Sequence, residues 1–293
     1  MAFGTFAFNY TLVGSSGYIA PRHIKAVKET GGNINSIVDV DFSPDSLKFF
    51  PDNIEKHTDL GEYFKKRNSD CDFIIICSPN FLHEEQISIA LENQTNVICE
   101  KPVALNLDGL NNLSSIESES EAHVNNILQL RLHPVILDLK EEVKETQNNY
   151  VKLTYVAKRE DSYFETWKGK SNLSGGLITN VGIHYLDLMT YIFGNFQDLE
   201  VTASEPKRSS GVLNLENCTI DWLFSFDERD VDEFIPKDQN SYRSIELNGT
   251  AIDFSDVPED LHTTSYKKIL KGKGFTLEDA RSSLEIIEAI NHN

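Results

Sequence analysis

The stretch VGSSGYIA, residues 13–20, decides how the first half of this 293-residue chain folds. It connects an apolar, strand-like run to a helix-like segment, so Gly14 and Gly17 lie at a strand-to-helix turn. Glycines at such a turn let the backbone approach a pyrophosphate, and the helix N-terminus attracts the anion. The spacing is G-x-x-G-x-x-A, one residue longer at its start than the usual G-x-G-x-x-G/A fingerprint. We therefore predict a dinucleotide site that includes Gly14, Gly17, Tyr18 and Ile19.

Short apolar runs alternate with helix-like stretches through the rest of the N-terminal part of the chain. Because strands and helices alternate in sequence, the pattern favours a parallel, doubly wound sheet, an α/β architecture. The strands are predicted over residues 6–13, 34–40, 73–77 and 96–99, and the helices between them over residues 22–29, 60–66 and 84–93.

An acidic residue ends the second predicted strand. Asp39 follows Gly17 at a spacing of about 20 residues, which is typical of the carboxylate that binds the ribose of a dinucleotide. An acid at this place repels the 2′-phosphate of NADP, so the sequence favours NAD as the cofactor. Asp41 is the alternative residue for this role.

The second half of the chain has a different pattern, in which apolar and polar residues alternate with period two, as in antiparallel strands with one polar face. Asn248-Gly249 is a strong hairpin signal between two of these runs. We expect a nucleotide-binding domain over residues 1–122 and an α+β domain with a large, mostly antiparallel open sheet over residues 123–293. The strands of the second domain are predicted over residues 150–159, 217–226, 244–247 and 251–254, and its helices over residues 180–193 and 277–290.

The charge of the chain excludes several classes of partner. Its 27 basic and 46 acidic residues give a net charge of −19, which argues against nucleic acid and against an anionic membrane surface. No run approaches the ~20 apolar residues of a transmembrane helix, and the N-terminus lacks the basic start of a signal peptide. The four cysteines form no C-x-x-C pair and are expected to be reduced thiols of a cytoplasmic protein.

Two polar motifs follow predicted strands, at the edge where open α/β sheets bind ligands. Ser78-Pro79-Asn80 follows the third strand, and His83 comes shortly after it; a cofactor contact and a structural role suit this histidine equally well. Glu100-Lys101-Pro102 follows the fourth strand. A lysine at this edge can hydrogen-bond a substrate hydroxyl and stabilise an alkoxide as it forms. Lys101 is therefore a candidate catalytic residue.

A second candidate group lies in the segment SGGLITNVGIHYLD, residues 174–187. Asn180 and His184 are four residues apart, so they share one face of the predicted helix. Histidine is suited to taking a proton from a hydroxyl near neutral pH, because its pKa lies close to that range. Asp187 can orient the imidazole or cap a neighbouring element.

These motifs resemble those of the Gfo/Idh/MocA family of NAD(P)-dependent sugar oxidoreductases, and the resemblance covers essentially the whole chain. Within the family, residues 17–23, 77–80, 128–134, 167–169 and 179–184 look most similar to UDP-N-acetyl-2-amino-2-deoxy-D-glucuronate (UDP-GlcNAcA) 3-dehydrogenases.

The resemblance implies a Rossmann domain followed by an α/β domain, whose open sheet joins subunits into a homo-oligomer, a dimer or a tetramer. It implies that Lys101 and His184 flank the reacting carbon. Much of the family carries Asp where this chain has Asn180; because Asn cannot take a proton, the acid/base role falls on His184, with Asn180 orienting the substrate. It also implies cofactor contacts by Ser78, Pro79, Asn80, His83, Glu100 and Lys101.

The implied reaction is NAD-dependent oxidation of the 3-hydroxyl of UDP-GlcNAcA to the 3-oxo sugar nucleotide, in the biosynthesis of surface polysaccharides such as the O-antigen of lipopolysaccharide. Some relatives recycle NADH with 2-oxoglutarate. The substrate carries a diphosphate and a carboxylate, so local cations are needed, and Arg131, Arg159 and Lys168 are the candidates. In an extended strand, Gln129, Arg131 and His133 would share one face and form a binding wall. Trp167 and Tyr163 suit stacking on uracil and filling the core equally well.

Three alternatives remain open at this point. The first is that the substrate lacks the carboxylate, as in the related UDP-N-acetylglucosamine 3-dehydrogenases. A non-catalytic NAD-binding sensor would need neither Lys101 nor His184. A metal-dependent hydrolase has little support, because the eight histidines form no H-x-x-x-H or H-E-x-x-H arrangement, and no metal site is expected.

Overall fold

A computed structural model describes residues 7–67, 70–253 and 260–292. Its contacts divide the chain into two compact units. Within the described residues, the first unit comprises residues 7–104, 108–129 and 260–279, and the second comprises residues 105–107, 130–253 and 280–292. Each unit is built around one six-stranded sheet. Residue 122, where the sequence places the domain boundary, lies just before the last strand of the first sheet.

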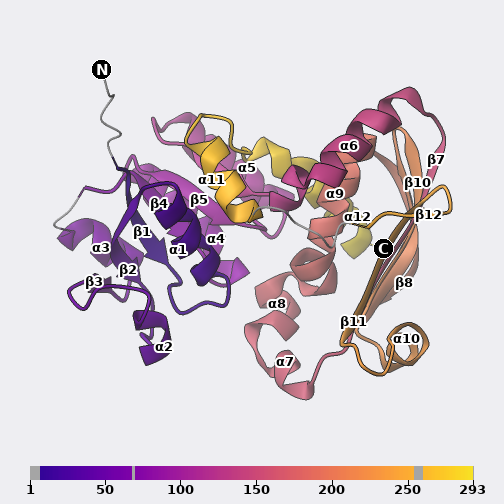
Figure 1. The fold of residues 1–293 in the computed structure, drawn as a ribbon, viewed down its shortest axis with the longest axis horizontal. Coiled ribbons are helices and arrows are strands. Elements are labelled where there is room, and N and C mark those ends of the chain that lie inside the picture. The colour runs from indigo at the N-terminus through magenta and orange to yellow at the C-terminus, as the bar shows by residue number, and fades with distance from the viewer. Residues whose placement is uncertain (1–6, 68–69, 254–259, 293) are drawn as a thin grey trace. The chain divides into compact units, whose positions relative to one another are not determined.

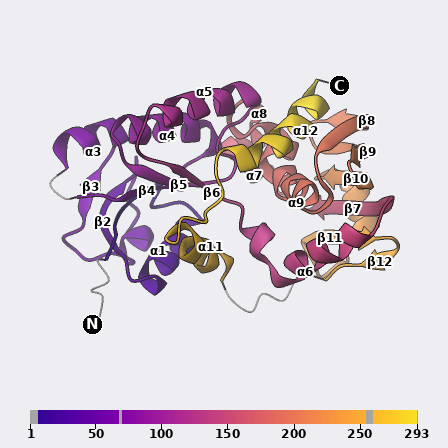
Figure 2. The same cartoon turned by 90° about the horizontal axis from the view of Figure 1, so that it is seen from above.

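The first sheet is parallel throughout, with the strand order β3-β2-β1-β4-β5-β6. This confirms the predicted doubly wound sheet. The order reverses direction between β1 and β4, and ligands bind at such a switch point in open α/β sheets. Figure 2 shows α3, α4 and α5 along one face of this sheet, and α1 and α11 along the other. The strands are β1 (Asn9–Val13), β2 (Asn33–Val38), β3 (Glu55–His57), β4 (Phe73–Ile76), β5 (Asn96–Glu100) and β6 (Val124–Ile127); the helices are α1 (Ala20–Glu29), α2 (Pro44–Leu47), α3 (Leu60–Lys66), α4 (His83–Glu92), α5 (Leu107–Ser118) and α11 (Leu261–Ile269).

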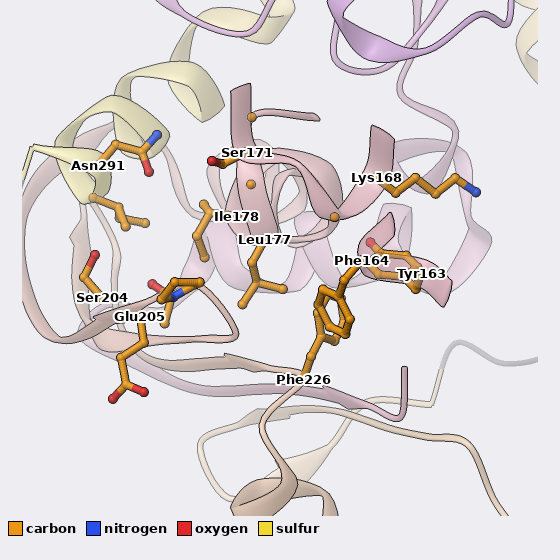
Figure 3. Close-up of a pocket in the computed structure, with 16 residues that line it drawn as sticks. Tyr163, Phe164, Lys168, Ser171, Leu177, Ile178, Ser204, Glu205, Phe226 and Asn291 are labelled. Carbon is orange, nitrogen blue, oxygen red and sulfur yellow. The ribbon is translucent and has the colours of Figure 1, made fainter. Parts of the chain in front are cut away.

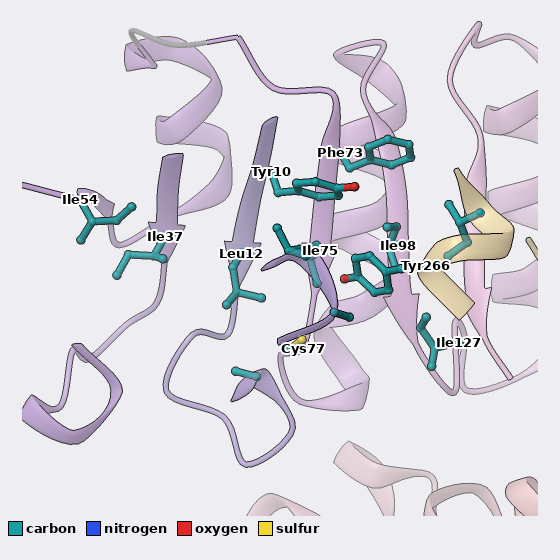
Figure 4. Close-up of a cluster of buried hydrophobic side chains, with 14 residues drawn as sticks. Tyr10, Leu12, Ile37, Ile54, Phe73, Ile75, Cys77, Ile98, Ile127 and Tyr266 are labelled. Atoms are coloured by element: carbon teal, nitrogen blue, oxygen red, sulfur yellow. The ribbon is translucent and has the colours of Figure 1, made fainter. Parts of the chain in front are cut away.

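The core of the first unit explains the apolar runs of its central strands. Every residue of β4 is buried, as expected for a strand that is covered on both faces. Figure 4 shows Leu12, Ile75 and Ile98 gathered with Tyr266, which α11 contributes from far along the chain. Residue 6, where the first strand was predicted to begin, lies outside the described residues.

The second sheet has the order β12-β11-β7-β10-β9-β8, and all of its pairs are antiparallel except β7 with β10. This confirms the mostly antiparallel prediction. Val151 and Leu153 are buried and Tyr150 and Lys152 are exposed, which is the predicted alternation. Figure 1 shows α6, α9 and α12 against one face of this sheet. The strands are β7 (Asn149–Ala157), β8 (Phe196–Glu205), β9 (Arg208–Leu215), β10 (Cys218–Ser225), β11 (Ser241–Leu247) and β12 (Thr250–Ala251); the helices are α6 (Pro134–Glu142), α7 (Asp161–Glu165), α8 (Ser171–Ser174), α9 (Ile183–Phe193), α10 (Glu228–Phe234) and α12 (Arg281–Asn291).

Local signals set several boundaries of these elements. Asn248 and Gly249, with φ angles of 51° and 82°, form the predicted hairpin turn between β11 and β12; residue 254, the end predicted for the second strand, lies outside the described residues. The four cysteines are free thiols. None of the helices in the described residues is long and apolar enough to cross a membrane.

Candidate functional site

The glycine turn after β1 can be built only with glycine at its first position. Gly14 has a φ of 77°, and a Cβ atom there would lie 2.6 Å from the backbone nitrogen of Ser78. A Cβ on Gly17 would lie 3.0 Å from the carbonyl oxygen of Gly14. The turn therefore packs closely against the chain that follows β4, as the sequence predicts for a loop that must let a pyrophosphate approach.

The donors around this turn fit a dinucleotide phosphate. Among the described residues, no side-chain hydrogen bond caps the N-terminus of α1, but the amides of Ala20 and Arg22 donate to the carbonyl oxygens of Gly17 and Ile19, and Pro21 has no amide hydrogen. The hydroxyl of Ser15 is buried and has no hydrogen-bond partner in the described structure. This hydroxyl is a donor that a phosphate oxygen can accept from.

Asp39 lies at the rim of the same turn. Its carboxylate accepts hydrogen bonds from the backbone amide of Ser16 at 2.8 Å and from that of Asp41 at 3.4 Å. The carboxylate is therefore fixed beside the glycine turn, where an acid favours the unphosphorylated ribose of NAD. Tyr18, which was predicted to line the dinucleotide, is 89% exposed.

His83 holds two loops together. Its Nδ1 lies 2.7 Å from the carbonyl oxygen of Pro102, and its Nε2 lies 2.8 Å from that of Ser78. The ring is buried, and this burial lowers the pKa of His83. Of the two roles predicted for this histidine, the geometry is that of the structural one: the ring ties the loop after β4 to the loop after β5. Asn80, also predicted to contact the cofactor, is buried beside it, whereas Pro79 is half-buried.

Glu100 is the last residue of β5, and its carboxylate faces the interior. It accepts hydrogen bonds from Nε2 of His23 and from Nε2 of His262, both at 3.0 Å. Burial by itself would raise the pKa of Glu100, but the two imidazole hydrogen bonds hold it well below its usual range. The side chain of Glu100 is thus engaged by two imidazoles from α1 and α11, and the cofactor contact predicted for this residue remains a prediction. Lys101 follows at once and is half-buried.

In the second unit, Asn180 and His184 lie on consecutive turns of one helical segment. Gly175 and Gly176, with φ angles of 79° and 81°, form the turn that precedes it. Residues Ile178–Gly182 then form a π-helical turn that contains Asn180, and His184 lies in the first turn of α9. π turns occur frequently at functional sites. Both side chains are half-buried, although most of the residues around them are buried.

Asn180 belongs to a cluster with two other predicted site residues. Its amide donates a hydrogen bond of 3.0 Å to the hydroxyl of Tyr163. The guanidinium of Arg159 lies 5.2 Å from the centre of the Tyr163 ring and 5.0 Å from that of Phe226, and it donates to the hydroxyl of Tyr155. Burial raises the pKa of Tyr163, although Arg159 opposes this. The hydroxyl of Tyr163 therefore remains protonated near neutral pH.

A cavity of about 320 Å³ opens beside this cluster. Figure 3 shows Tyr163 and Phe164 on one side of it, Phe226 below, and Lys168 directed outward. Trp167, predicted with these residues, is half-buried and does not line the cavity. The polar residues of the lining are Tyr163, Lys168, Ser171, Ser204, Glu205, Ser209 and Asn291.

The extended strand on which the predicted binding wall of Gln129, Arg131 and His133 depends is wrong. Residues Gln129–Leu132 form a 3₁₀ turn instead of an extended strand. Pro134 opens α6, and the side chain of His133 caps that helix by accepting a hydrogen bond from the amide of Val135. A proline at the first helical position with a capping residue before it is a helix start signal, and it takes precedence over the period-two pattern.

Arg131 is engaged in a buried ion pair. Its Nε and Nη2 donate to the two carboxylate oxygens of Asp187 at 3.0 and 2.7 Å. The two residues are 5% and 3% exposed, and the guanidinium also lies 4.9 Å from the centre of the Tyr191 ring. Asp187 and Tyr191 are both on α9, the helix that carries His184, so Arg131 holds that helix in place. Gln129 keeps a buried amide oxygen with no hydrogen-bond partner in the described structure.

Two family models cover most of the chain. Residues 8–126 match the model described as "Oxidoreductase family, NAD-binding Rossmann fold", and residues 147–291 match "Oxidoreductase family, C-terminal alpha/beta domain". The chain belongs to the Gfo/Idh/MocA oxidoreductase family. Its first unit is thus the NAD-binding Rossmann domain of an oxidoreductase.

Two solved structures extend the likeness to nearly the whole chain. A WlbA (WbpB) dehydrogenase from Thermus thermophilus, in complex with NAD and UDP-GlcNAcA, is 36% identical with a TM-score of 0.87, over 96% of this chain and 93% of that one. The same dehydrogenase in complex with NAD and alpha-ketoglutarate is 37% identical with a TM-score of 0.86, over 94% and 92% of the two chains.

Curated relatives are more distant. Putative oxidoreductase YteT of Bacillus subtilis is 27% identical over 44% of this chain and 31% of its own length. Glucose-6-phosphate 3-dehydrogenase of the same organism is 25% identical over 41% of this chain and 36% of its own length. The chain therefore matches only about a third of the length of these relatives.

The two candidate catalytic residues of this Gfo/Idh/MocA chain belong to different units, Lys101 to the first and His184 to the second. Their convergence on one substrate carbon remains a prediction.

Sequence reasoning missed His262 and Tyr266, which lie four residues apart on one face of α11 and contact Glu100 and His23. That spacing was a visible signal; the partner on a distant strand was not.

Proposed function

We propose that the protein is an NAD-dependent dehydrogenase that oxidises the 3-hydroxyl of UDP-GlcNAcA to the 3-oxo sugar nucleotide. The observation that carries this proposal is the 36% identity, over nearly the full length of both chains, with the Thermus thermophilus dehydrogenase that holds NAD and UDP-GlcNAcA. The glycine turn, the Asp39 carboxylate and the presence of Lys101 and His184 support it.

The residues of this chain divide the work as follows. Bound NAD supplies the hydride acceptor. His184 takes the proton of the 3-hydroxyl, directly or through Lys101, because an imidazole changes its charge near neutral pH. Lys101 donates a hydrogen bond to the developing alkoxide and stabilises its charge. Asn180, oriented by its hydrogen bond to Tyr163, positions the sugar.

The anionic groups of the substrate require cations. Arg159 is stacked between two aromatic rings, and Lys168 borders the cavity; we assign them to the carboxylate and the diphosphate. We assign Gln129, Tyr163 and Trp167 to the rest of the sugar nucleotide, with Trp167 outside the cavity. Because Arg131 is paired with Asp187, it supports α9 and is left out of the substrate contacts.

A second candidate substrate is UDP-N-acetylglucosamine, which has no carboxylate. The observation that favours it is the engagement of Arg131 by Asp187, since this leaves one guanidinium fewer for the uronate. A comparison of kcat/KM for the two UDP-sugars decides between them. We expect the uronate to be preferred, and Arg159→Ala to reduce that preference about tenfold or more, as for loss of a charge-assisted hydrogen bond.

The function itself is tested by NADH absorbance after NAD and UDP-GlcNAcA are mixed with the purified chain. We expect NADH to form, and Lys101→Ala and His184→Asn to lower kcat by about 10²–10⁴-fold, as expected for loss of acid/base catalysis. Addition of 2-oxoglutarate tests whether it re-oxidises the NADH, as the complex of the similar dehydrogenase with alpha-ketoglutarate leads us to propose. NAD binding without turnover of either sugar would instead indicate a sensor.

We also propose that copies of the chain assemble through the exposed face of the second sheet, where Tyr150 and Lys152 lie. Light scattering of the purified chain tests this, with Tyr150→Glu as the disruptive variant. A monomeric mass for the unaltered chain would contradict it. We place the enzyme in the cytoplasm, where NAD and nucleotide sugars are available and where its four thiols stay reduced.

A further inference from the structure

Glu100 is the centre of a buried hydrogen-bond network that links three parts of the first unit. His23 comes from α1, the helix after the glycine turn, and His262 and Tyr266 come from α11. All three residues are at most 2% exposed, and Glu100 is 7% exposed. A carboxylate at this depth is stable only if hydrogen bonds compensate for the lost hydration.

The partners fix the protonation of each ring. Glu100 accepts from both imidazoles, so His23 and His262 each carry a proton on Nε2. Nδ1 of His23 lies 2.8 Å from the hydroxyl of Tyr266 and accepts a hydrogen bond from it, because burial raises the pKa of Tyr266 and the hydroxyl keeps its proton. Burial lowers the pKa of His23. The network therefore contains the Glu100 carboxylate and a neutral His23 imidazole, with the donors running in one direction from Tyr266 through His23 to Glu100.

Other titratable groups surround this network without entering it. Cys77 and Cys99 are buried thiols whose pKa values are raised well above the usual value by burial. Asp260, which caps α11, has an oxygen 3.9 Å from Nδ1 of His262, beyond hydrogen-bond distance. Within this network, Glu100 is therefore the negatively charged group. It directly precedes Lys101 in the chain.

The same three side chains have a spacing that a divalent metal would accept, since the ligand atoms of His23, Glu100 and His262 lie within 4.8 Å of one another. A closed structural zinc site requires four protein ligands, and the described residues around the cluster supply three. The 3.0 Å contacts and the donor from Tyr266 are fully explained by hydrogen bonds.

We propose that Glu100 is a positioning residue for catalysis: held by His23 and His262, its carboxylate fixes the end of β5, from which Lys101 follows, and places a negative charge one residue before the lysine. On the other side of the lysine, His83 binds the carbonyl oxygen of Pro102. Lys101 is thus held between two anchored neighbours. This inference rests on the proposed catalytic role of Lys101.

The test compares Glu100→Gln with a matched control in the NAD-loaded chain. The control concerns a second hydrogen bond between α11 and α1, which the hydroxyl of Thr263 donates to the carboxylate of Glu29. This bond does not involve Glu100, and the variant Thr263→Val removes it. We expect E100Q to lower kcat about tenfold or more, the scale on which small misplacements of a catalytic group act, with the KM for the sugar little changed. We expect T263V to lower thermal stability and leave kcat unchanged.

A second measurement reads Lys101 directly. The lysines are methylated with ¹³C and titrated by NMR, and the Lys101 signal is identified by its loss in Lys101→Arg. E100Q lacks the neighbouring negative charge, so its Lys101 should lose its proton at a lower pH than Lys101 of the unaltered chain. In T263V, Lys101 should lose its proton at the same pH as in the unaltered chain. This readout needs no sugar turnover, so it remains decisive if the unaltered chain oxidises neither UDP-sugar and the proposed function fails.

Several results would overturn the proposal: an unchanged kcat and an unchanged Lys101 titration in E100Q, an equal loss of kcat in T263V, or one equivalent of metal in the purified protein by elemental analysis. If E100Q does not fold, Tyr266→Phe decides, because it removes one hydroxyl and keeps the carboxylate. We expect Y266F to lower kcat by a smaller factor than E100Q in the same direction; a kcat equal to that of the unaltered chain would refute the positioning role.

Discussion

The Arg131–Asp187 pair provides the sharpest test of how the second unit is held together. Replacement of Arg131 by methionine keeps most of the side-chain volume and removes the guanidinium. Asp187, 3% exposed, is then left as a buried carboxylate without the guanidinium that donates a hydrogen bond to each of its oxygens. We expect a large loss of stability and no change in the choice between UDP-GlcNAcA and UDP-N-acetylglucosamine.

The magnitude follows from the geometry. The contacts of 2.7 and 3.0 Å make a two-pronged, charge-assisted pair, and removal of one partner of a buried pair costs about 3–5 kcal/mol. At about 2–4 °C per kcal/mol for a domain of 150–250 residues, R131M should lower the melting temperature by about 6–20 °C. The double variant R131M with Asp187→Leu removes both charges and should recover most of the loss, because neither charge is then left buried and unpaired.

The assay combines thermal melting with kinetics on both sugars. Arg229 forms a solvent-exposed pair with Asp227, so Arg229→Ala is a matched control and should leave the melting temperature unchanged. If Arg131 instead bound the substrate carboxylate, R131M would raise the KM for UDP-GlcNAcA alone. A melting temperature equal to that of the unaltered chain, together with loss of preference for the uronate, would refute the reasoning.

Three further predictions concern the first unit. Gly14→Ala should lower NADH affinity at least about tenfold, because a Cβ lies 2.6 Å from the amide nitrogen of Ser78 at a φ of 77°; fluorescence titration checks this, and unchanged affinity contradicts it. Asp39→Ala should raise the ratio of NADP to NAD efficiency, because it removes the charge that repels a 2′-phosphate; steady-state kinetics with both cofactors measure this, and an unchanged ratio would exclude a role for Asp39 in cofactor choice. Acidification should destabilise the chain: burial lowers the pKa of His23 below 6.5, so the stability from its neutral form is complete above pH 6.5 and is lost below it by about 1.4 kcal/mol per pH unit. Equal urea midpoints at about pH 7.5 and about pH 5.5 would contradict this sign.

Local sequence patterns predicted the elements well where one physical signal dominated. The all-apolar run of β4 indicated a strand covered on both faces, and the helix over Leu60–Lys66 was predicted with the boundaries that the structure has. The glycine turn and Asp39 were placed correctly beside each other because strand, turn and helix follow in one short stretch. Prediction failed at residues 129–133, where a helix start signal at Pro134 competed with a period-two pattern.

The sequence by itself determined four of the six strands in each sheet, the glycine turn and the residue types that carry the proposed chemistry, because each depends on neighbours within a few positions. It did not predict β3, β6, β8 or β9. Only the tertiary structure decided which long-range partner each polar group has. In the structure, Arg131 pairs with Asp187, and Glu100 accepts hydrogen bonds from His23 and His262, which lie 77 and 162 residues away along the chain. The physical reason is that a buried charge must find its partner wherever the fold brings one, and residues so far apart in sequence are joined by packing that no local pattern records.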